Sequence, residues 1–224
     1  MKMRHASAAL GLLALVLGGA ACSDGRSHAR ATCVLVDVSG TYADQRPEVA
    51  RIVKSGLLPK VRPGDSFLLV RIDDDSYGKE AVEATVTFDA QPSRANAQKL
   101  TLAGKLERFA ASRKRARFTD ISGALLLASE YLRETRAGKK TIVIFSDMKE
   151  ELPPGARRTL GPKELEGIDV VALNVKRLGQ DKLDPTGYRK RLSGWGTRLA
   201  ASGAASWKVV LDPEELVQEF AGEM

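Results

Sequence analysis

The stretch that decides the fold is Cys33-Val34-Leu35-Val36-Asp37-Val38-Ser39-Gly40-Thr41. Its first four residues form a continuous apolar run, which is typical of a central parallel strand buried on both faces. Oxygen-bearing side chains follow at every second position, from Asp37 through Ser39 to Thr41. In an α/β protein the carboxyl ends of parallel strands lie at one edge of the sheet, and binding sites form there. The stretch therefore predicts a buried strand with a site at its carboxyl end.

Two later segments place similar side chains where they would reach the same edge. The apolar run 142–145 ends in Ser146-Asp147, and Thr119-Asp120 precedes the apolar stripe of a strongly amphipathic helix. A cluster of hydroxyl and carboxylate oxygens without His or Cys suits a hard divalent cation. We therefore expect a metal site to which all three segments contribute, formed by Asp37, Ser39, Thr41, Thr119 and Asp147.

Strands alternate with helices along the rest of the chain. This order predicts an α/β fold with a doubly wound, mostly parallel six-stranded sheet flanked by helices. The expected strands are 32–38, 66–72, 83–88 (a half-exposed edge strand), 140–146, 168–175 and 207–211. The expected helices are about 47–58, 93–111, from 119 or 120 to a stop near 138, a short one at 163–165, 188–201, and one after 212.

The composition is that of an ordinary globular protein, and it argues against several kinds of site. The 224 residues fit one domain with an ample core, and they are 43% hydrophobic and 28% charged. Both histidines, His5 and His28, lie near the N-terminus, so His-based catalysis and zinc sites are not expected. The sequence has no Gly-rich phosphate loop, no Gly-x-Ser-x-Gly and no nucleic-acid-binding motif.

The first residues have the features of an export signal. Lys2 and Arg4 give a positive start, and residues 9–17 form an apolar run that is too short to span a membrane as an ordinary helix. Small residues at 18–21 then precede Cys22. This pattern resembles a bacterial lipoprotein signal, in which the Cys becomes the lipidated N-terminus, although Gly19 stands where such signals usually have Leu.

The chain is therefore expected to have three parts: a lipoprotein-type signal peptide at 1–21, a flexible tether at 22–31 and a domain at 32–224. Lipidation of Cys22 would place the domain in the bacterial cell envelope, facing the periplasm, on either the inner or the outer membrane. Plain cleavage of a secretory signal near residue 21 or 23 is an alternative, and an uncleaved anchor is another. Cys33 is interpreted as a buried core residue. A disulfide between Cys22 and Cys33 is the alternative that lipidation would exclude.

Loss of residues 1–21 would remove two of the chain's positive charges and lower the formal net charge from +7 to about +5. A mild basic excess suits an anionic partner or a membrane surface, although many inert proteins share it.

The order and spacing of the three oxygen-bearing segments resemble a von Willebrand factor type A (VWA) domain over roughly residues 32–222. That family has Asp-x-Ser-x-Ser after its first strand, a Thr before a helix, and an Asp after its fourth strand. Here Thr41 replaces the last Ser of the first motif and keeps its hydroxyl. Thr119 opens Thr-Asp-Ile-Ser-Gly-Ala-Leu, which is similar to the family's Thr-Asn-Ile-x-x-Ala-Leu. Asp147 closes Thr-Ile-Val-Ile-Phe-Ser-Asp, and Met148 follows where the family often has Gly.

This resemblance implies a Rossmann-like VWA fold with a metal-ion-dependent adhesion site. Ser39, Thr41 and Thr119 would coordinate the cation directly, while Asp37 and Asp147 would orient its waters and the hydroxyl groups. Mg²⁺ is the expected cation, with Mn²⁺ or Ca²⁺ as alternatives. A partner protein would supply a carboxylate as a further ligand, so the resemblance implies a protein-binding module and no enzyme. A membrane partner is expected only through the lipid anchor, and no nucleic acid is expected.

Two other functions remain open at this point. Asp-Val-Ser-Gly-Thr also resembles the nucleophile motif of haloacid-dehalogenase phosphatases, with Asp37 as the nucleophile and Ser146 in the second motif. Ser39 stands where those enzymes have their general acid, and no catalytic Lys is well placed. The other alternative is a metal-free structural or interaction lipoprotein, in which Asp37 and Asp147 lie in ordinary turns and Thr119 or Asp120 is only a helix cap.

Two charged segments accompany the predicted site. Asp73-Asp74-Asp75 follows the second strand and would either add a cation site or form a solvated turn. The basic run 113–117 directly precedes Thr119, where it would either steer an acidic partner or form a solvated, flexible loop.

Overall fold

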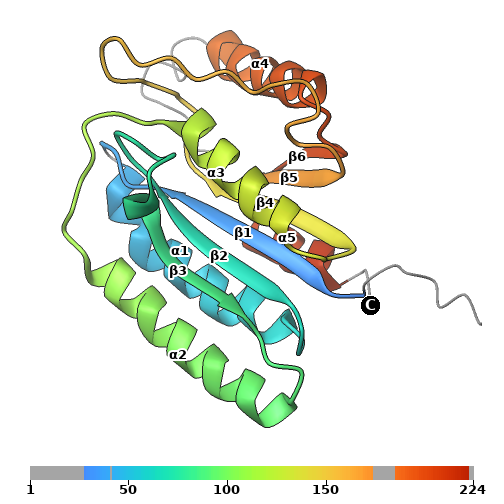
Figure 1. The fold of residues 1–224 in the computed structure, drawn as a ribbon. Coiled ribbons are helices and arrows are strands. Elements are labelled where there is room, and N and C mark those ends of the chain that lie inside the picture. The colour runs from blue at the N-terminus through green and yellow to red at the C-terminus, as the bar shows by residue number, and fades with distance from the viewer. Residues whose placement is uncertain (1–27, 41, 174–184, 222–224) are drawn as a thin grey trace, which may run out of the picture.

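The computed structural model describes residues 28–40, 42–173 and 185–221 (Figure 1). They form a six-stranded sheet with the strand order β3-β2-β1-β4-β5-β6. Every neighbouring pair is parallel except β2 and β3, which are antiparallel. The predicted class, a mostly parallel six-stranded α/β sheet, is confirmed. The strands are β1 (Arg30–Asp37), β2 (Ser66–Ile72), β3 (Val82–Thr87), β4 (Lys139–Phe145), β5 (Ile168–Leu173) and β6 (Ser206–Val210).

The register of β1 explains why polar residues meet at one edge. Asp37 at the end of β1 pairs with Ile72 at the end of β2, and Val36 pairs with Phe145 at the end of β4. The three strands therefore stop at nearly the same level. The loops that follow them start side by side at the carboxyl edge of the sheet.

Helices cover both faces of the sheet (Figure 1). Successive side chains of β1 alternate between two apolar cores, as the period of a strand requires. Val34 and Val36 share one core with residues of α1, α2 and α5, while Cys33 and Leu35 share the other with residues of α3 and α4. The helices are α1 (Arg46–Ile52), α2 (Pro92–Ala111), α3 (Ile121–Glu134), α4 (Pro185–Ala201) and α5 (Pro213–Ala221).

The helix predicted at 47–58 is regular only as far as Ile52. It continues as a π-helical turn, η2 (Val53–Leu57), and a 3₁₀ turn, η3 (Leu58–Lys60). Gly56 allows η2 to pack closely against α5, because a Cβ at position 56 would lie 2.6 Å from Cγ2 of Val217. The remaining short helical turns are η1 (Tyr42–Gln45) and η4 (Lys79–Ala81).

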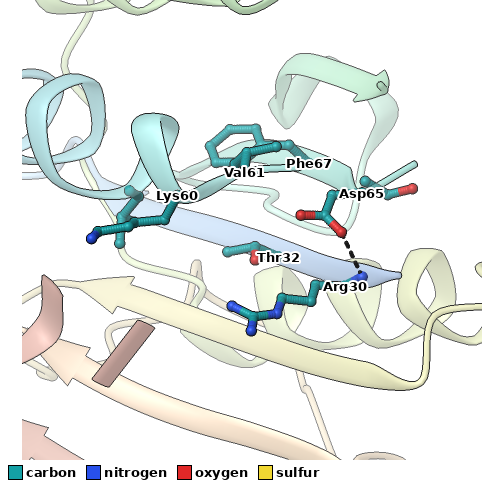
Figure 2. A pocket seen from close by; sticks show the side chains of 8 residues that line it. Arg30, Thr32, Lys60, Val61, Asp65 and Phe67 are labelled. Carbon is teal, nitrogen blue, oxygen red and sulfur yellow. Dashed lines mark hydrogen bonds between the residues drawn. The ribbon is translucent and has the colours of Figure 1, made fainter. Parts of the chain in front are cut away.

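Three local predictions need correction. β1 begins at Arg30, inside the predicted tether, because the Asp65 carboxylate accepts a hydrogen bond from the Arg30 amide at 2.8 Å (Figure 2). The short helix at 163–165 is a turn, and Lys163 has a φ of 65°, which a right-handed helix does not allow. The third helix ends at Glu134, four residues before the predicted stop at Gly138.

The pocket in Figure 2 lies at the amino ends of β1 and β2, opposite the predicted site. Its volume is about 10 Å³, which is room for about one water molecule. A ligand-binding role is therefore not assigned to this pocket.

Cys33 is fully buried, as predicted for a core residue, and burial raises the pKa of its thiol well above the ordinary value. In the part of the chain that the structure describes, no helix combines the length and apolar character that a membrane span needs. The predicted signal peptide, Cys22 and most of the predicted tether lie outside the described residues.

Candidate metal centre

Asp37 ends β1 and is buried at the carboxyl edge, with 1% of its surface exposed. Its Oδ1 accepts hydrogen bonds from the Ser39 amide at 2.8 Å and from the Ser39 hydroxyl at 2.6 Å. Its Oδ2 accepts a hydrogen bond from the Ser146 hydroxyl at 2.8 Å. The carboxylate thus fixes the loop after β1 and joins it to the loop after β4.

Thr119 brings the third segment to the same point. Its hydroxyl donates to the Ser39 hydroxyl at 2.7 Å. Two backbone hydrogen bonds with Glu151, of 2.7 and 3.1 Å, hold Thr119 against the chain that follows β4. The result is a continuous hydrogen-bonded row from Thr119 through Ser39 and Asp37 to Ser146, in which each side chain orients the next.

Asp147 lies beside this row, and among the described residues no hydrogen bond joins its carboxylate to the row. The residue is half-buried, and its Oδ1 accepts a hydrogen bond from the Lys149 amide at 2.8 Å. Its charge is close enough to contribute to the raised pKa of Asp37. Of the five predicted ligands, Asp37, Ser39 and Thr119 are joined directly and Asp147 is an electrostatic neighbour. Thr41 falls outside the described residues.

Burial dominates the electrostatics of the site. It raises the pKa of Asp37 to about 6, against the hydrogen bonds from Ser39 and Ser146, which favour the ionised form. Burial also raises the pKa of Asp147. Ionising both Asp37 and Asp147 is costly because they are buried and close together. A cation bound beside them would reduce this cost.

The donor atoms fit a hard cation. The Ser39 and Thr119 hydroxyl oxygens are 2.7 Å apart. Two adjacent ligands in an octahedron around Mg²⁺, each at about 2.1 Å, would be about 3 Å apart. Within residues 28–40, 42–173 and 185–221 no group of three or more His, Cys, Asp or Glu residues could hold a metal. A centre here therefore depends on hydroxyl oxygens, which suit Mg²⁺ and not the Cys- and His-bound zinc of structural sites.

The two accessory segments are structural braces. The Asp74 carboxylate accepts hydrogen bonds from the amides of Arg117 and Phe118 at 2.9 and 2.7 Å, which fixes the chain just before Thr119. Asp73 binds Arg71, and Asp75 binds Arg158. The predicted solvated turn at 73–75 is confirmed, since Asp74 and Asp75 are exposed, and its carboxylates also brace neighbouring segments. No group of carboxylates that could hold a second cation is found there among the described residues.

The basic run 113–117 is a solvent-exposed loop, as one alternative predicted, and it is anchored at Arg115 and Ala116. The Arg115 guanidinium donates to the Gly40 carbonyl at 3.0 Å and pairs with Asp44. The Ala116 amide donates to the Val38 carbonyl at 3.1 Å. The run is thereby tied to the loop after β1.

Helix α4 holds the chain segment that follows β4 and carries Asp147, a contact that the sequence did not reveal. Arg191 donates to the Asp147 carbonyl at 3.0 Å, and Trp195 donates to the Met148 carbonyl at 2.8 Å. Arg198 pairs with Glu150 at 3.0 Å. The signal that could have found them is their helical spacing, since residues three and four apart share one helix face.

Met148, which stands where VWA domains often have Gly, has a φ of 62° and a fully buried side chain. The backbone therefore has the left-handed conformation that Gly adopts without strain, with a bulkier residue in place.

A solved structure shares this fold at low sequence identity. No family model matches the chain, and no curated protein matches it. Among solved structures, a D319A mutant of the PilB minor pilin from Streptococcus sanguinis is similar, with a TM-score of 0.53 and 11% identity over 88% of this chain and 61% of that one. A VWA structure from Catenulispora acidiphila has a TM-score of 0.49 and 12% identity over 88% and 42% of the two chains. BatB from Bacteroides thetaiotaomicron has a TM-score of 0.49 and 14% identity over 87% and 98%.

The six-stranded α/β fold predicted from the sequence is thus found in a solved structure as well. The pilin shows the fold of the sheet and helices. The meeting of the three motifs at the carboxyl edge adds an observation on this chain that is independent of any match.

Proposed function

We propose that this VWA-like domain is a non-enzymatic protein-binding module with a Mg²⁺-dependent adhesion site at the carboxyl edge of its sheet. The observation that carries the proposal is the row Thr119–Ser39–Asp37–Ser146, in which hydroxyl and carboxylate oxygens from three distant segments lie within hydrogen-bond distance. The hydrogen bonds of this row do not fully offset the cost of burying the Asp37 carboxylate, whose pKa stays raised.

The residues have distinct roles in this proposal. Ser39, Thr41 and Thr119 would hold Mg²⁺, or Mn²⁺ or Ca²⁺, through neutral oxygens, while Asp37 and Asp147 would orient the hydroxyls and bound waters. The bound cation would supply a positive charge that its neutral ligands leave uncompensated. A partner protein would bind there through a Glu or Asp carboxylate.

The surroundings of Asp37 argue against the phosphatase alternative. A nucleophilic carboxylate must reach a phosphorus atom with a free oxygen. Asp37 is 1% exposed, and both of its oxygens accept hydrogen bonds. Its geometry suits a residue that orients neighbouring hydroxyls.

The N-terminal features complete the proposal. Residues 1–21 would be removed as a lipoprotein-type signal, Cys22 would carry the lipid, and the domain would face the periplasm from one membrane of the bacterial envelope. Full-length wild type should fractionate with membranes, and Cys22→Ala should not be lipidated. Recovery of unlipidated wild type in the soluble fraction would contradict the anchor and leave the adhesion site unaffected.

The adhesion site is tested by calorimetric titration of the purified full-length chain with Mg²⁺ and with Mn²⁺. Wild type should bind one ion saturably, and Asp37→Ala and Asp37→Asn should not. Asp89→Asn is the matched control, because Asp89 lies at the opposite edge and an Asn there can still accept the Gln91 amide hydrogen bond. Equal binding by wild type and Asp37→Asn would overturn the proposed site.

A further inference from the structure

Helix α2 covers one face of the sheet, on the side opposite α3 and α4 (Figure 1). Its inner side packs into the core through Leu102, Leu106 and Phe109. A helix of 20 residues is about 30 Å long, so its outer side is a long convex strip of protein surface. We call this outer side, together with the exposed residue Arg113 that follows the helix, the α2 surface.

The charge of the α2 surface is strongly positive. Two carboxylates belong to it, and each has a cation of its own. Glu107 pairs with Lys54 at 2.5 Å, and Asp89, just before the helix, lies 3.6 Å from Arg94.

Four further cations of the α2 surface have no ion pair among the described residues. Arg108 and Arg113 are exposed, and the other two are half-buried. These four cations are Lys99, Lys105, Arg108 and Arg113. Together with Lys54 and Arg94 they make six cations against two carboxylates, a formal excess of +4. Adjoining α1 does not offset this excess, because its Glu48 pairs with Arg51.

Leu100 lies in the middle of α2 with 76% of its surface exposed, more than Leu211 at 66%. Ala97 and Gly104, three residues before it and four after it, share its side of the helix. Nη1 of Arg108 would lie 3.7 Å from a Cβ at Gly104, which places that guanidinium on the same side. An exposed leucine among small residues is therefore accompanied by a cation.

This combination suits an anionic lipid surface better than an acidic protein segment. A membrane presents phosphates over the whole length of a helix that lies flat on it, so cations spread along α2 could all contribute. Leu100 could enter between the lipid headgroups and leave water. An acidic protein segment would satisfy the cations and leave Leu100 without an apolar neighbour.

The predicted anchor would bring such a surface within reach. The chain advances eight residues from Cys22 to Arg30, where β1 begins, and can span about 26–29 Å. A lipid on Cys22 would limit the distance of the domain from the bilayer and leave its orientation free. Contact through α2 would fix that orientation.

We propose that the α2 surface lies on an anionic phospholipid membrane, with Leu100 among the headgroups and the unpaired cations beside the lipid phosphates. This contact is separate from the Mg²⁺ centre and adds a second membrane contact to the predicted anchor. Salt screens charges over about 10 Å at 0.1 M, so cations on the membrane side of the domain contribute most.

The first test measures binding of the purified full-length chain in EDTA to phosphatidylcholine vesicles with and without phosphatidylglycerol. Arg108→Glu/Arg113→Glu should weaken binding to the phosphatidylglycerol vesicles by about tenfold or more, because each reversal replaces an attraction with a repulsion. Arg189→Glu/Lys190→Glu on α4 changes the net charge equally at exposed positions and should weaken it by less than about threefold. Residues 1–21 are the same in every variant, so their own affinity for lipid cannot produce this difference.

The second test places a tryptophan on either face of the domain and adds brominated lipids, which quench tryptophan fluorescence on contact. Leu100→Trp should be quenched by vesicles that contain phosphatidylglycerol, and Thr197→Trp, at an exposed position of α4, should not. The natural residues Trp195 and Trp207 are common to both variants and give the same background.

Equal loss of vesicle binding in the two charge-reversal variants would overturn the proposal, because the effect would then come from net charge alone. Equal quenching of Leu100→Trp and Thr197→Trp would also overturn it. Tighter binding to polyglutamate than to the vesicles, lost in Arg108→Glu/Arg113→Glu, would assign the α2 surface to an acidic protein instead. Since EDTA removes Mg²⁺ throughout, each of these results leaves the proposed adhesion site standing.

Discussion

At the scale of single residues, Asp37 shows how the candidate centre is held at a cost to stability. Its pKa of about 6 in the folded protein lies above the value near 3.9 of an unfolded Asp. The folded chain therefore binds the proton more tightly than the unfolded chain does. The contribution of Asp37 to the free energy of unfolding is fully present below about pH 4 and is lost as the pH rises through about 6.

This difference in pKa predicts that the free energies of unfolding of wild type and Asp37→Asn differ by an amount that depends on pH, in the absence of divalent cations. Two pKa units correspond to about 3 kcal/mol. The free energy of unfolding of wild type, relative to the variant, should therefore fall by up to about 3 kcal/mol between pH 4 and pH 8. Urea denaturation in EDTA measures both free energies of unfolding. A difference between them that stays constant from pH 4 to pH 8 would contradict the raised pKa of Asp37.

Met148 offers a second test at the same scale, because its backbone is left-handed and its side chain is buried. Met148→Gly and Met148→Ala both remove the side chain and should lower the free energy of unfolding by a few kcal/mol. Only the glycine variant also relieves the backbone. Met148→Gly should therefore be more stable than Met148→Ala by about 1 kcal/mol in urea denaturation, against the usual advantage of alanine. Greater stability of the alanine variant would show that the φ of 62° carries no strain.

At the scale of elements, the start of α3 depends on one close contact. Asp120 caps the helix by accepting a hydrogen bond from the Gly123 amide at 2.7 Å, and it also binds Arg158. A Cβ at Gly123 would overlap the Asp120 carboxylate. Thr119, which precedes this cap, is thereby tied to the helix start.

Gly123→Ala should therefore lower the free energy of unfolding by about 1–2 kcal/mol, through loss of the cap. Gly104→Ala in α2 is the control, since its Cβ would meet nothing closer than an Arg108 nitrogen at 3.7 Å. That variant should be stabilised by about 0.5–1 kcal/mol, as is usual for alanine in a helix. Thermal and urea denaturation measure both. If Gly123→Ala stabilised the protein as much as Gly104→Ala, the Asp120 carboxylate could not occupy the space that a Cβ at position 123 needs.

Helix α4 carries a further prediction. Trp195→Phe keeps an aromatic ring and leaves the Met148 carbonyl without its indole donor, which should cost about 1–3 kcal/mol of stability. It should also weaken Mg²⁺ binding several-fold, because Met148 adjoins Asp147. Trp207→Phe removes the other tryptophan and should leave Mg²⁺ affinity unchanged in the same calorimetric titration. Unchanged affinity in Trp195→Phe would confine α4 to a role in stability.

At the scale of the whole molecule, the sequence predicted the sheet well because its central strands are apolar on both faces. β2 has the predicted bounds, and the ends of β4 differ by one residue. The predicted helix at 163–165 was wrong because Lys163 adopts a positive φ and the Leu165 amide donates to the Ser202 carbonyl, a contact that no local pattern reveals.

The candidate site was predictable to the same extent. Strand ends and a helix start pointed to Asp37, Ser39 and Thr119, which the structure joins. The role of Asp75 could not be predicted, because its partner Arg158 comes 83 residues later in the chain. The support from α4 was missed for the same reason, since Trp195 and the Met148 carbonyl are 47 residues apart.

The row of oxygens at the centre also has a consequence in time. Ser39 and Thr119 are 80 residues apart, and Asp37 and Ser146 are 109 residues apart. Contacts this distant in sequence require the closure of long loops and exist only once the sheet has assembled. A nascent or still-unfolded chain would therefore carry the separate motifs and no adhesive surface. Under the proposed function, the chain would become able to capture a partner only when folding is complete, which would protect it from premature association.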